Sequence, residues 1–194
     1  MATTPPPSTP PTQPPPPARV ASTGARPEPG TARAGSRPCS VADALSVVGE
    51  KYSLLVLREV FLGVRRFDAI ARNTGAPRDI LAARLRRLTE GGVLEKTLYS
   101  TRPARHEYHL TDAGRELEPV LHLLRQWGDR HLTDRPPITV EHSCGTGLDP
   151  ILVCRTCGEP VTEGSCRVHF QLPGWTFAGA VPAQAPSDDR PAEA

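Results

Sequence analysis

The pattern of apolar and polar positions predicts several helices followed by a pair of strands. Apolar side chains recur every three or four residues from Val41 onward, which is the spacing of one face of an α-helix. The helices expected from this spacing cover Val41–Val48, Ser53–Leu62, Phe67–Asn73 and Arg78–Glu90. Ser40 is the expected N-cap of the first helix, with Asp43 in the capping-box position.

The segment RDILAARLRRLTEGGVLEK, residues 78–96, raises the main question about function. The residues of its apolar face are Leu81, Leu85 and Leu88, and its arginines are Arg78, Arg84, Arg86 and Arg87. Gly91 and Gly92 are expected to end the helix, because glycine adopts the left-handed C-cap conformation without steric cost. Such a helix either lies in a DNA groove or has an ordinary solvated basic face.

A two-stranded ribbon and a long helix complete the pattern. Strands are expected at Val93–Tyr99 and His106–Leu110, joined by the basic loop STRPAR, and Thr111 can cap a helix from Asp112 to Leu132. The apolar positions of that helix include Leu117, Val120, Leu121, Leu124 and Trp127. A short helix, a tight turn and a basic helix form a helix-turn-helix unit, and the ribbon forms a wing. The expected fold is therefore mostly α with a small β-wing (α+β): a winged helix-turn-helix.

Composition divides the chain into four segments. Residues 1–38 hold 12 of the 23 prolines and are expected to be a disordered arm, because they cannot bury enough apolar surface. Residues 39–134 are the expected winged helix-turn-helix domain for DNA binding and dimerisation, and residues 139–177 a small, β-rich, zinc-ribbon-like segment. Residues 178–194 are expected to be a disordered tail.

The chain shows no membrane or secretion signal in its sequence. Residues 1–38 have no apolar signal-peptide core, and no run of about 18 apolar residues occurs. A cytoplasmic, nucleoid-associated protein without a membrane partner is therefore expected.

Charge is concentrated in one region. The net charge is only +2, but residues 65–105 contain ten Lys and Arg against four Asp and Glu. A basic patch on a nearly neutral protein is the footprint expected of a nucleic-acid contact. Together with the predicted order of elements, it favours DNA binding over a solvated basic face.

Several motifs in a fixed order resemble one family. The cysteine of CSVADAL is followed by GEKYSLLVLREVFLGVRRFDAI, LAARLRRLTEGGVLEK, EYHLTDAGREL and LRQWGDRH. From Cys39 to about Leu132 the chain resembles the HxlR-type regulators, within the MarR/ArsR-like winged-helix superfamily. The resemblance implies a homodimeric transcription regulator that binds double-stranded operator DNA, here interpreted as a repressor. Departures from the family pattern are Glu50, Tyr52 and Pro77, the last of which removes a phosphate-contacting hydroxyl that Arg78 can replace.

The recognition helix supplies the candidate base contacts. Arg78, Asp79 and Ala82 are expected to face the major groove, with Arg86 one turn further along. Arginine suits bidentate contact with guanine, aspartate accepts from cytosine, and alanine meets a thymine methyl.

Arg84 and the wing are expected to position the protein on DNA. Arg84 matches the family's recurring arginine, which implies contact with phosphate or anchoring of the helix; the alternative is a salt bridge to Asp68 or Glu90. The wing residues expected to contact phosphate or the minor groove are Lys96, Arg102 and Arg105, over the wing from Val93 to Leu110.

Dimerisation is expected through the long helix with Trp127 and the first helix around Val41–Val48. Two half-sites about 34–36 Å apart require two recognition helices. The alternative is that Leu121, Leu124 and Trp127 pack within one chain. A different class of function, a protein-interaction winged helix with a structural zinc ribbon, also stays open.

The five cysteines predict a metal site and a candidate sensor. The segment HSCGTGLDPILVCRTCGE carries the expected zinc ligands Cys144, Cys154, Cys157 and His142, a nitrogen and sulfur set suited to structural Zn²⁺. Cys166 and His169 compete with His142 for the fourth position. Cys39 is a candidate redox sensor, and a small buried residue at a helix start is the alternative. Because the catalytic motifs of enzymes are absent from the sequence, no enzyme activity is expected.

Overall fold

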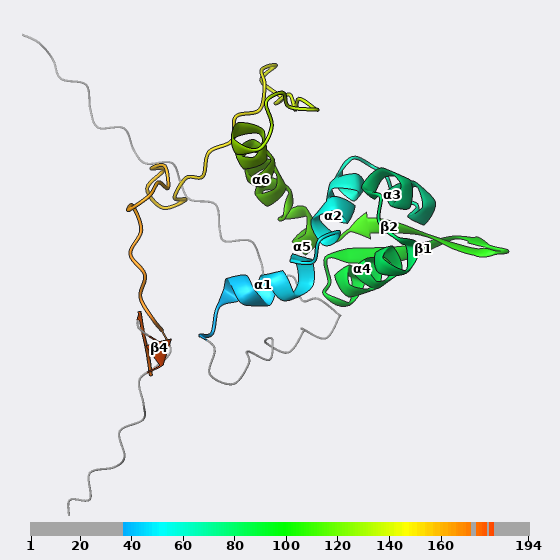
Figure 1. Ribbon diagram of the computed structural model, residues 1–194, viewed down its shortest axis with the longest axis horizontal. Helices are drawn as coiled ribbons and strands as arrows, with labels where there is room; N and C mark the ends of the chain where they lie inside the picture. Colours follow the sequence, from blue (N-terminus) through cyan, green and yellow to red (C-terminus); the bar gives the residue numbers. More distant parts are fainter. Residues whose placement is uncertain (1–36, 172–173, 178, 181–194) are drawn as a thin grey trace, which may run out of the picture.

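The computed structural model describes residues 37–171, 174–177 and 179–180. In chain order the elements are α1 (Ser40–Val48), α2 (Ser53–Phe61), α3 (Phe67–Thr74), α4 (Arg78–Glu90), β1 (Leu94–Thr101), β2 (Ala104–Leu110), α5 (Asp112–Arg115), α6 (Glu118–His131), β3 (Trp175–Thr176) and β4 (Gly179–Ala180). The β1–β2 ribbon projects from one end of the molecule, and α1 lies at the opposite end (Figure 1). This is the mostly helical winged helix-turn-helix fold expected from the sequence.

One apolar core joins α2, α3, α4 and the start of the ribbon. Its fully buried side chains include Val56, Leu57, Ile70, Leu81, Leu85, Leu88 and Leu94. The leucines of α4 face inward as their spacing predicts, so the arginines of α4 lie toward its other sides. Burial of each such side chain contributes about 1.5–3 kcal/mol, which makes this cluster the main source of stability.

The wing is longer than predicted. Leu94 pairs with Leu110 and Thr101 with Ala104 in an antiparallel register, with an irregularity between Leu98 and Ser100. The expected loop STRPAR is thus largely part of the strands, because the backbone of its outer residues pairs across the ribbon and leaves only Arg102 and Pro103 at the tip.

The expected long helix from Asp112 to Leu132 is divided into α5 and α6. Pro119 stands in the first turn of α6, where its missing N–H is not needed but where it cannot continue a helix begun upstream. Thr111 caps α5 as predicted, since its hydroxyl accepts from the Gly114 amide at 3.0 Å. The same hydroxyl donates to the Gly92 carbonyl at 2.6 Å and joins α5 to the end of α4.

The start of α1 differs from the expected capping box. Cys39 is the N-cap residue, and no side-chain hydrogen bond caps the helix. Ser40 is instead the first helical residue, so its hydroxyl is not placed to accept from the amides of the first turn.

Hydrogen bonds join the described part of the tail to α6 and to Arg37, which precedes α1. Arg125 of α6 donates to the Leu148 carbonyl at 3.4 Å, and Gln126 donates to the Asp149 carboxylate. Further along, Arg37 donates to the carbonyl oxygens of Thr176 and Phe177, at 3.1 and 2.8 Å.

Candidate DNA-binding surface

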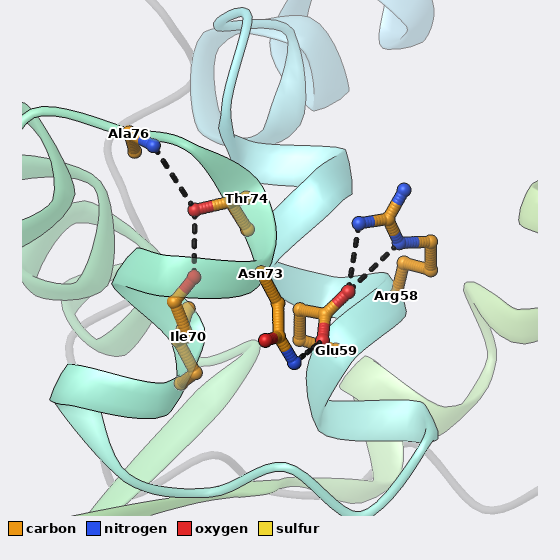
Figure 2. Close-up of polar contacts among 6 residues, drawn as sticks. All are labelled: Arg58, Glu59, Ile70, Asn73, Thr74 and Ala76. Carbon is orange, nitrogen blue, oxygen red and sulfur yellow. Dashed lines mark hydrogen bonds and ion pairs between the residues drawn. The ribbon is translucent and has the colours of Figure 1, made fainter.

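The turn between α3 and α4 is built for a sharp change of direction. Gly75 adopts a left-handed conformation with φ +66°, a region that favours glycine. The Thr74 hydroxyl donates to the Ile70 carbonyl at 2.7 Å and accepts from the Ala76 amide at 3.3 Å (Figure 2). These bonds satisfy backbone groups at the end of α3 and fix the angle at which α4 begins.

A buried carboxylate joins α2 to the end of α3. The Glu59 side chain is 5% exposed; one of its oxygens accepts from Arg58 Nη2 at 2.7 Å. Its other oxygen accepts from the Asn73 amide at 2.7 Å, so both carboxylate oxygens have partners (Figure 2). Sequence reasoning missed this pair, although a glutamate within the apolar stretch SLLVLREVF is a signal of a buried polar contact.

The predicted groove residues of α4 are exposed together. Arg78, Asp79, Ala82 and Arg86 all lie at the surface, on the sides of α4 away from its buried leucines. The Arg78 guanidinium pairs with Asp68 at 2.8 Å and lies 4.9 Å from the centre of the Phe67 ring. Arg78 is therefore held at the α3 side of the helix-turn-helix unit.

Arg84 makes an intradomain ion pair, but not with the expected residue. Its side chain is 21% exposed and reaches Glu50 at 3.2 Å. The acidic residues that sequence reasoning proposed have other partners, since Asp68 pairs with Arg78 and Glu90 lies 3.9 Å from Arg86. This placement favours the anchoring role of Arg84 over contact with phosphate.

Arg87 also stabilises the domain, because its Nε donates to the Ser46 carbonyl at 3.0 Å. It joins α4 to α1, as Arg84 joins α4 to the link between α1 and α2. Arg84 and Arg87 thus bind groups outside α4, whereas Arg78 and Arg86 form exposed ion pairs with Asp68 and Glu90.

The wing carries its cations outward. Lys96, Arg102 and Arg105 are all exposed, as expected for residues that contact a nucleic-acid backbone. Arg66 contacts both strands of the ribbon. Its Nε donates to Glu107 of β2 at 2.9 Å, and its guanidinium lies 4.5 Å from the centre of the Tyr99 ring of β1. The hydrogen bond to Glu107, together with smaller electrostatic contributions from Tyr99 and Glu107, raises the pKa of Arg66.

A groove of about 520 Å³ separates α3 and the start of α4 from the wing. Its charged and polar lining includes Arg66, Arg72, Arg78, Arg105 and His106. The groove brings together two predicted residues, Arg78 from the recognition helix and Arg105 from the wing, that are 27 positions apart in sequence. Arg72, which was not predicted from the sequence, also lines the groove, because α3 packs beside the ribbon.

Two further stripes of exposed apolar residues lie on α6 and on α1. Val120, Leu124 and Trp127 follow helical spacing on α6, and Trp127 is 52% exposed. Leu117 and Leu121 pack instead against the core, so the apolar positions of the expected long helix divide between two directions. On α1, Val41 and Leu45 are exposed in the same way.

The candidate zinc ligands form two pairs. The Cys144 amide donates to His142 Nδ1 at 3.3 Å, and Cys154 and Cys157 share one turn closed by the Gly158 amide on the Cys154 carbonyl at 2.7 Å. Across residues 37–171 and the short stretches resolved after them, no three His, Cys, Asp or Glu side chains form a group that could hold a metal ion. The two predicted pairs are not brought together, and zinc binding stays a prediction.

Hydrogen bonds favour thiolates in both turns. The Thr146 hydroxyl, then His142 and the Thr146 amide, lower the pKa of Cys144 from 9.0 to about 7. The amides of Cys157 and Thr156 lower the pKa of Cys154 in the same direction. Cys39 is exposed at the start of α1, so it is not buried within one chain, and its role as a redox sensor stays a prediction.

No helix in the described ranges is both long enough and apolar enough to span a membrane.

The HxlR-like helix-turn-helix family model matches residues 47–136. An HTH-type transcriptional regulator of Mycobacterium tuberculosis is 51% identical over 126 residues, which cover 63% of this chain and 80% of the relative. This chain belongs to the HxlR-like helix-turn-helix family. Another such regulator, from Synechocystis, is 37% identical over 116 residues, 58% of this chain and 82% of the relative.

Solved structures agree with this HxlR-like assignment. The crystal structure of PA1607, described as a candidate transcription factor, has a TM-score of 0.60 and 34% identity, covering 68% of this chain and 94% of that one. A second structure, of a candidate transcription factor from Pseudomonas aeruginosa, has a TM-score of 0.51 and 30% identity, and the match covers 73% of this chain and 97% of that one. These proteins are described as a transcriptional regulator and a candidate transcription factor, which is the class of function that the sequence predicts for this HxlR-like protein.

Proposed function

We propose that this HxlR-like regulator is a sequence-specific repressor that binds an operator as a homodimer. The observation that carries the proposal is the basic groove, where Arg78 of α4 and Arg105 of the wing line one surface. In this arrangement α4 enters the major groove and the wing follows the phosphate backbone. The proposed target also places the protein in the cytoplasm, with the nucleoid.

Base recognition is assigned to the exposed side of α4. Asp79 and Ala82 lie in its first turns, nearest the base edges, and Arg86 follows on the same side. Arg78 is held by Asp68, and DNA binding exchanges this exposed ion pair for a phosphate or a guanine edge. An exposed ion pair contributes only about 0–1 kcal/mol, so the exchange costs little.

Dimerisation is assigned to the exposed apolar stripes. The stripe of Val120, Leu124 and Trp127 on α6 is supplemented by Val41 and Leu45 on α1. Large apolar residues clustered in this way are typical of a protein interface. We assign a second copy of this chain as the partner that covers the stripes, because an operator with two half-sites requires two recognition helices. Repression follows when the bound dimer covers a promoter.

The second candidate function is a protein-interaction module. The same exposed stripe on α6 favours it, because a partner of another kind could cover Trp127. Salt dependence separates the two functions. A dimer that neutralises about 6–10 phosphates loses about 10³–10⁵ in affinity between about 50 and 200 mM salt, whereas an apolar protein interface loses far less.

The deciding experiment is fluorescence anisotropy with duplexes that tile the upstream region of the protein's own gene, over a salt series. We expect one duplex to bind tightly with a steep salt slope. Arg105→Ala should weaken binding and reduce the slope by about 1. The matched control is Arg130→Ala, because Arg130 is exposed on α6, away from the wing.

Three outcomes would contradict parts of the proposal. Equal weak binding to every duplex, extended to a random genomic library, would argue against sequence-specific binding. Equal slopes for the Arg105→Ala and Arg130→Ala variants would remove the wing from the interface. Trp127→Glu should produce a monomer in sedimentation with weaker operator binding, and a dimer that persists would exclude the α6 stripe.

A further inference from the structure

The segment after α6 is folded into hairpins rather than extended. In the first, Glu141 bridges Gly147, and the His142 amide donates to the Thr146 carbonyl at 2.8 Å. In the second, Val153 bridges Pro160, and the Cys154 amide donates to the Glu159 carbonyl at 2.8 Å. Each hairpin therefore has a defined backbone geometry.

These hairpins have no apolar core. No residue from 135 to 171 is buried, and the apolar run of Ile151, Leu152 and Val153 is exposed, with Ile151 at 71%. A segment of about 40 residues cannot bury enough surface to hold a fixed fold, and disulfides or metals usually supply the missing stability. The backbone is ordered by something other than hydrophobic packing.

Each hairpin presents two metal-ligand side chains from one turn. His142 and Cys144 belong to the first, and Cys154 and Cys157 to the second. A glycine with positive φ follows the last cysteine of each turn, Gly145 at +84° and Gly158 at +76°. Glycine adopts these angles without steric cost, so in both hairpins the chain can turn directly after the cysteine.

From this repeated arrangement we infer that one Zn²⁺ ion joins the two hairpins through His142, Cys144, Cys154 and Cys157. One nitrogen and three sulfur ligands complete a tetrahedral structural site. Since no group of three donors exists among the residues described, the second hairpin has to approach the first when the metal binds. Each of the three thiols releases its proton on coordination, and no electrons are transferred.

The pairing of donors decides the fourth ligand. His142 shares a turn with Cys144; its Nδ1 accepts from the Cys144 amide at 3.3 Å and gives up that bond when the ring binds the metal. Cys166 follows a third turn, closed by the Ser165 amide on the Thr162 carbonyl at 3.1 Å. Residues 162–165 of that third turn include no Cys or His that could pair with Cys166. We therefore assign the fourth position to His142 and leave Cys166 and His169 outside the site.

The site would fix the tail on α6. The first hairpin ends at Leu148 and Asp149, which accept hydrogen bonds from Arg125 and Gln126 of α6. Zinc binding would add stability to both hairpins, and these two hydrogen bonds would connect the first of them to the helix. The winged helix, with its own core, keeps its fold without the metal.

Cobalt titration of the full-length protein tests the inference. The protein is purified under reducing conditions, stripped with a chelator and titrated with Co²⁺, which reports tetrahedral thiolate coordination by its absorption. We expect one equivalent per chain, displaced by Zn²⁺. Cys144→Ser and Cys154→Ser should abolish this spectrum, while the matched variants Cys166→Ser and Cys39→Ser should retain it.

Hydrogen exchange gives a second readout that does not depend on DNA binding. Adding Zn²⁺ to the stripped protein should slow amide exchange in residues 140–161 and leave the core of α2 and α4 unchanged. Absence of tetrahedral cobalt absorption overturns the inference, as does dependence on Cys166 in place of Cys144. Recovery of the tail cysteines as disulfides by mass spectrometry in the freshly isolated protein also overturns it.

Discussion

The winged-helix domain and the segment that follows it are stabilised in opposite ways. Residues 48–94 contain all the buried apolar side chains of the described structure, whereas residues 135–171 contain none. Both regions have defined turns and hydrogen bonds. The difference shows that hydrogen-bonded turns alone do not identify a stable domain, and that the source of stability has to be found separately for each region.

The largest expected effect comes from opening the apolar core. Leu57 is fully buried, and Leu57→Ala should reduce the free energy of unfolding by about 2–5 kcal/mol, because it leaves a cavity. Ile151→Ala in the tail should change it by less than about 0.5 kcal/mol. Urea denaturation followed by helical circular dichroism measures both. Equal losses would mean that the tail shares the core of the domain.

The buried carboxylate gives the next effect. Glu59→Gln keeps the shape of the side chain but weakens its bonds to Arg58 and Asn73, and should cost about 1–3 kcal/mol of stability. Operator affinity should also fall, since Asn73 orients the end of α3. The exposed Glu90→Gln is the control. If both variants unfold at the same urea concentration, the link between α2 and α3 has no energetic role.

Arg84→Ala separates anchoring from DNA contact. Because Arg84 is mostly buried against an exposed partner, Glu50, its loss should reduce stability by about 0.2–1 kcal/mol. The salt slope and the operator affinity should stay nearly unchanged, whereas Arg86→Ala, which removes a proposed base contact, should weaken operator binding. A slope reduced by about 1 for Arg84→Ala would assign this arginine to phosphate instead.

The smallest expected effect concerns a single thiol of the tail. The pKa of Cys144 is lowered to about 7, so in stripped protein its alkylation by iodoacetamide should rise through neutral pH, where the thiol becomes thiolate. Thr146→Val removes the largest cause of the shift and should move this rise to higher pH. The Cys144→Ser variant corrects for the other cysteines. An unchanged pH profile would exclude the Thr146 hydrogen bond as the cause.

Local signals made much of the domain predictable. The bounds of α4 agree with the prediction, because Pro77 stands before its first turn and Gly91 after its last. The division of the long helix was missed, since Pro119 is compatible both with a new first turn and with the apolar spacing around it.

The partners of the arginines were not predictable from spacing. Arg84 had acidic residues within reach along the sequence, yet its partner is Glu50, which only the packing of α1 against α4 brings near. Arg72 joins the basic groove for a similar reason, because α3 packs beside a ribbon formed about 30 residues later. The basic surface of α4 and the wing could be predicted from the sequence, but tertiary packing decides which of its cations remain available for DNA.

The contact between Arg37 and the carbonyls of Thr176 and Phe177 spans almost the whole described chain. It places both ends of that chain at one pole of the molecule, opposite the tip of the wing (Figure 1). Fluorophores attached beside Arg37 and beside Phe177 would therefore begin close together and far from bound DNA. Their energy transfer would report detachment of the tail while the operator remains occupied.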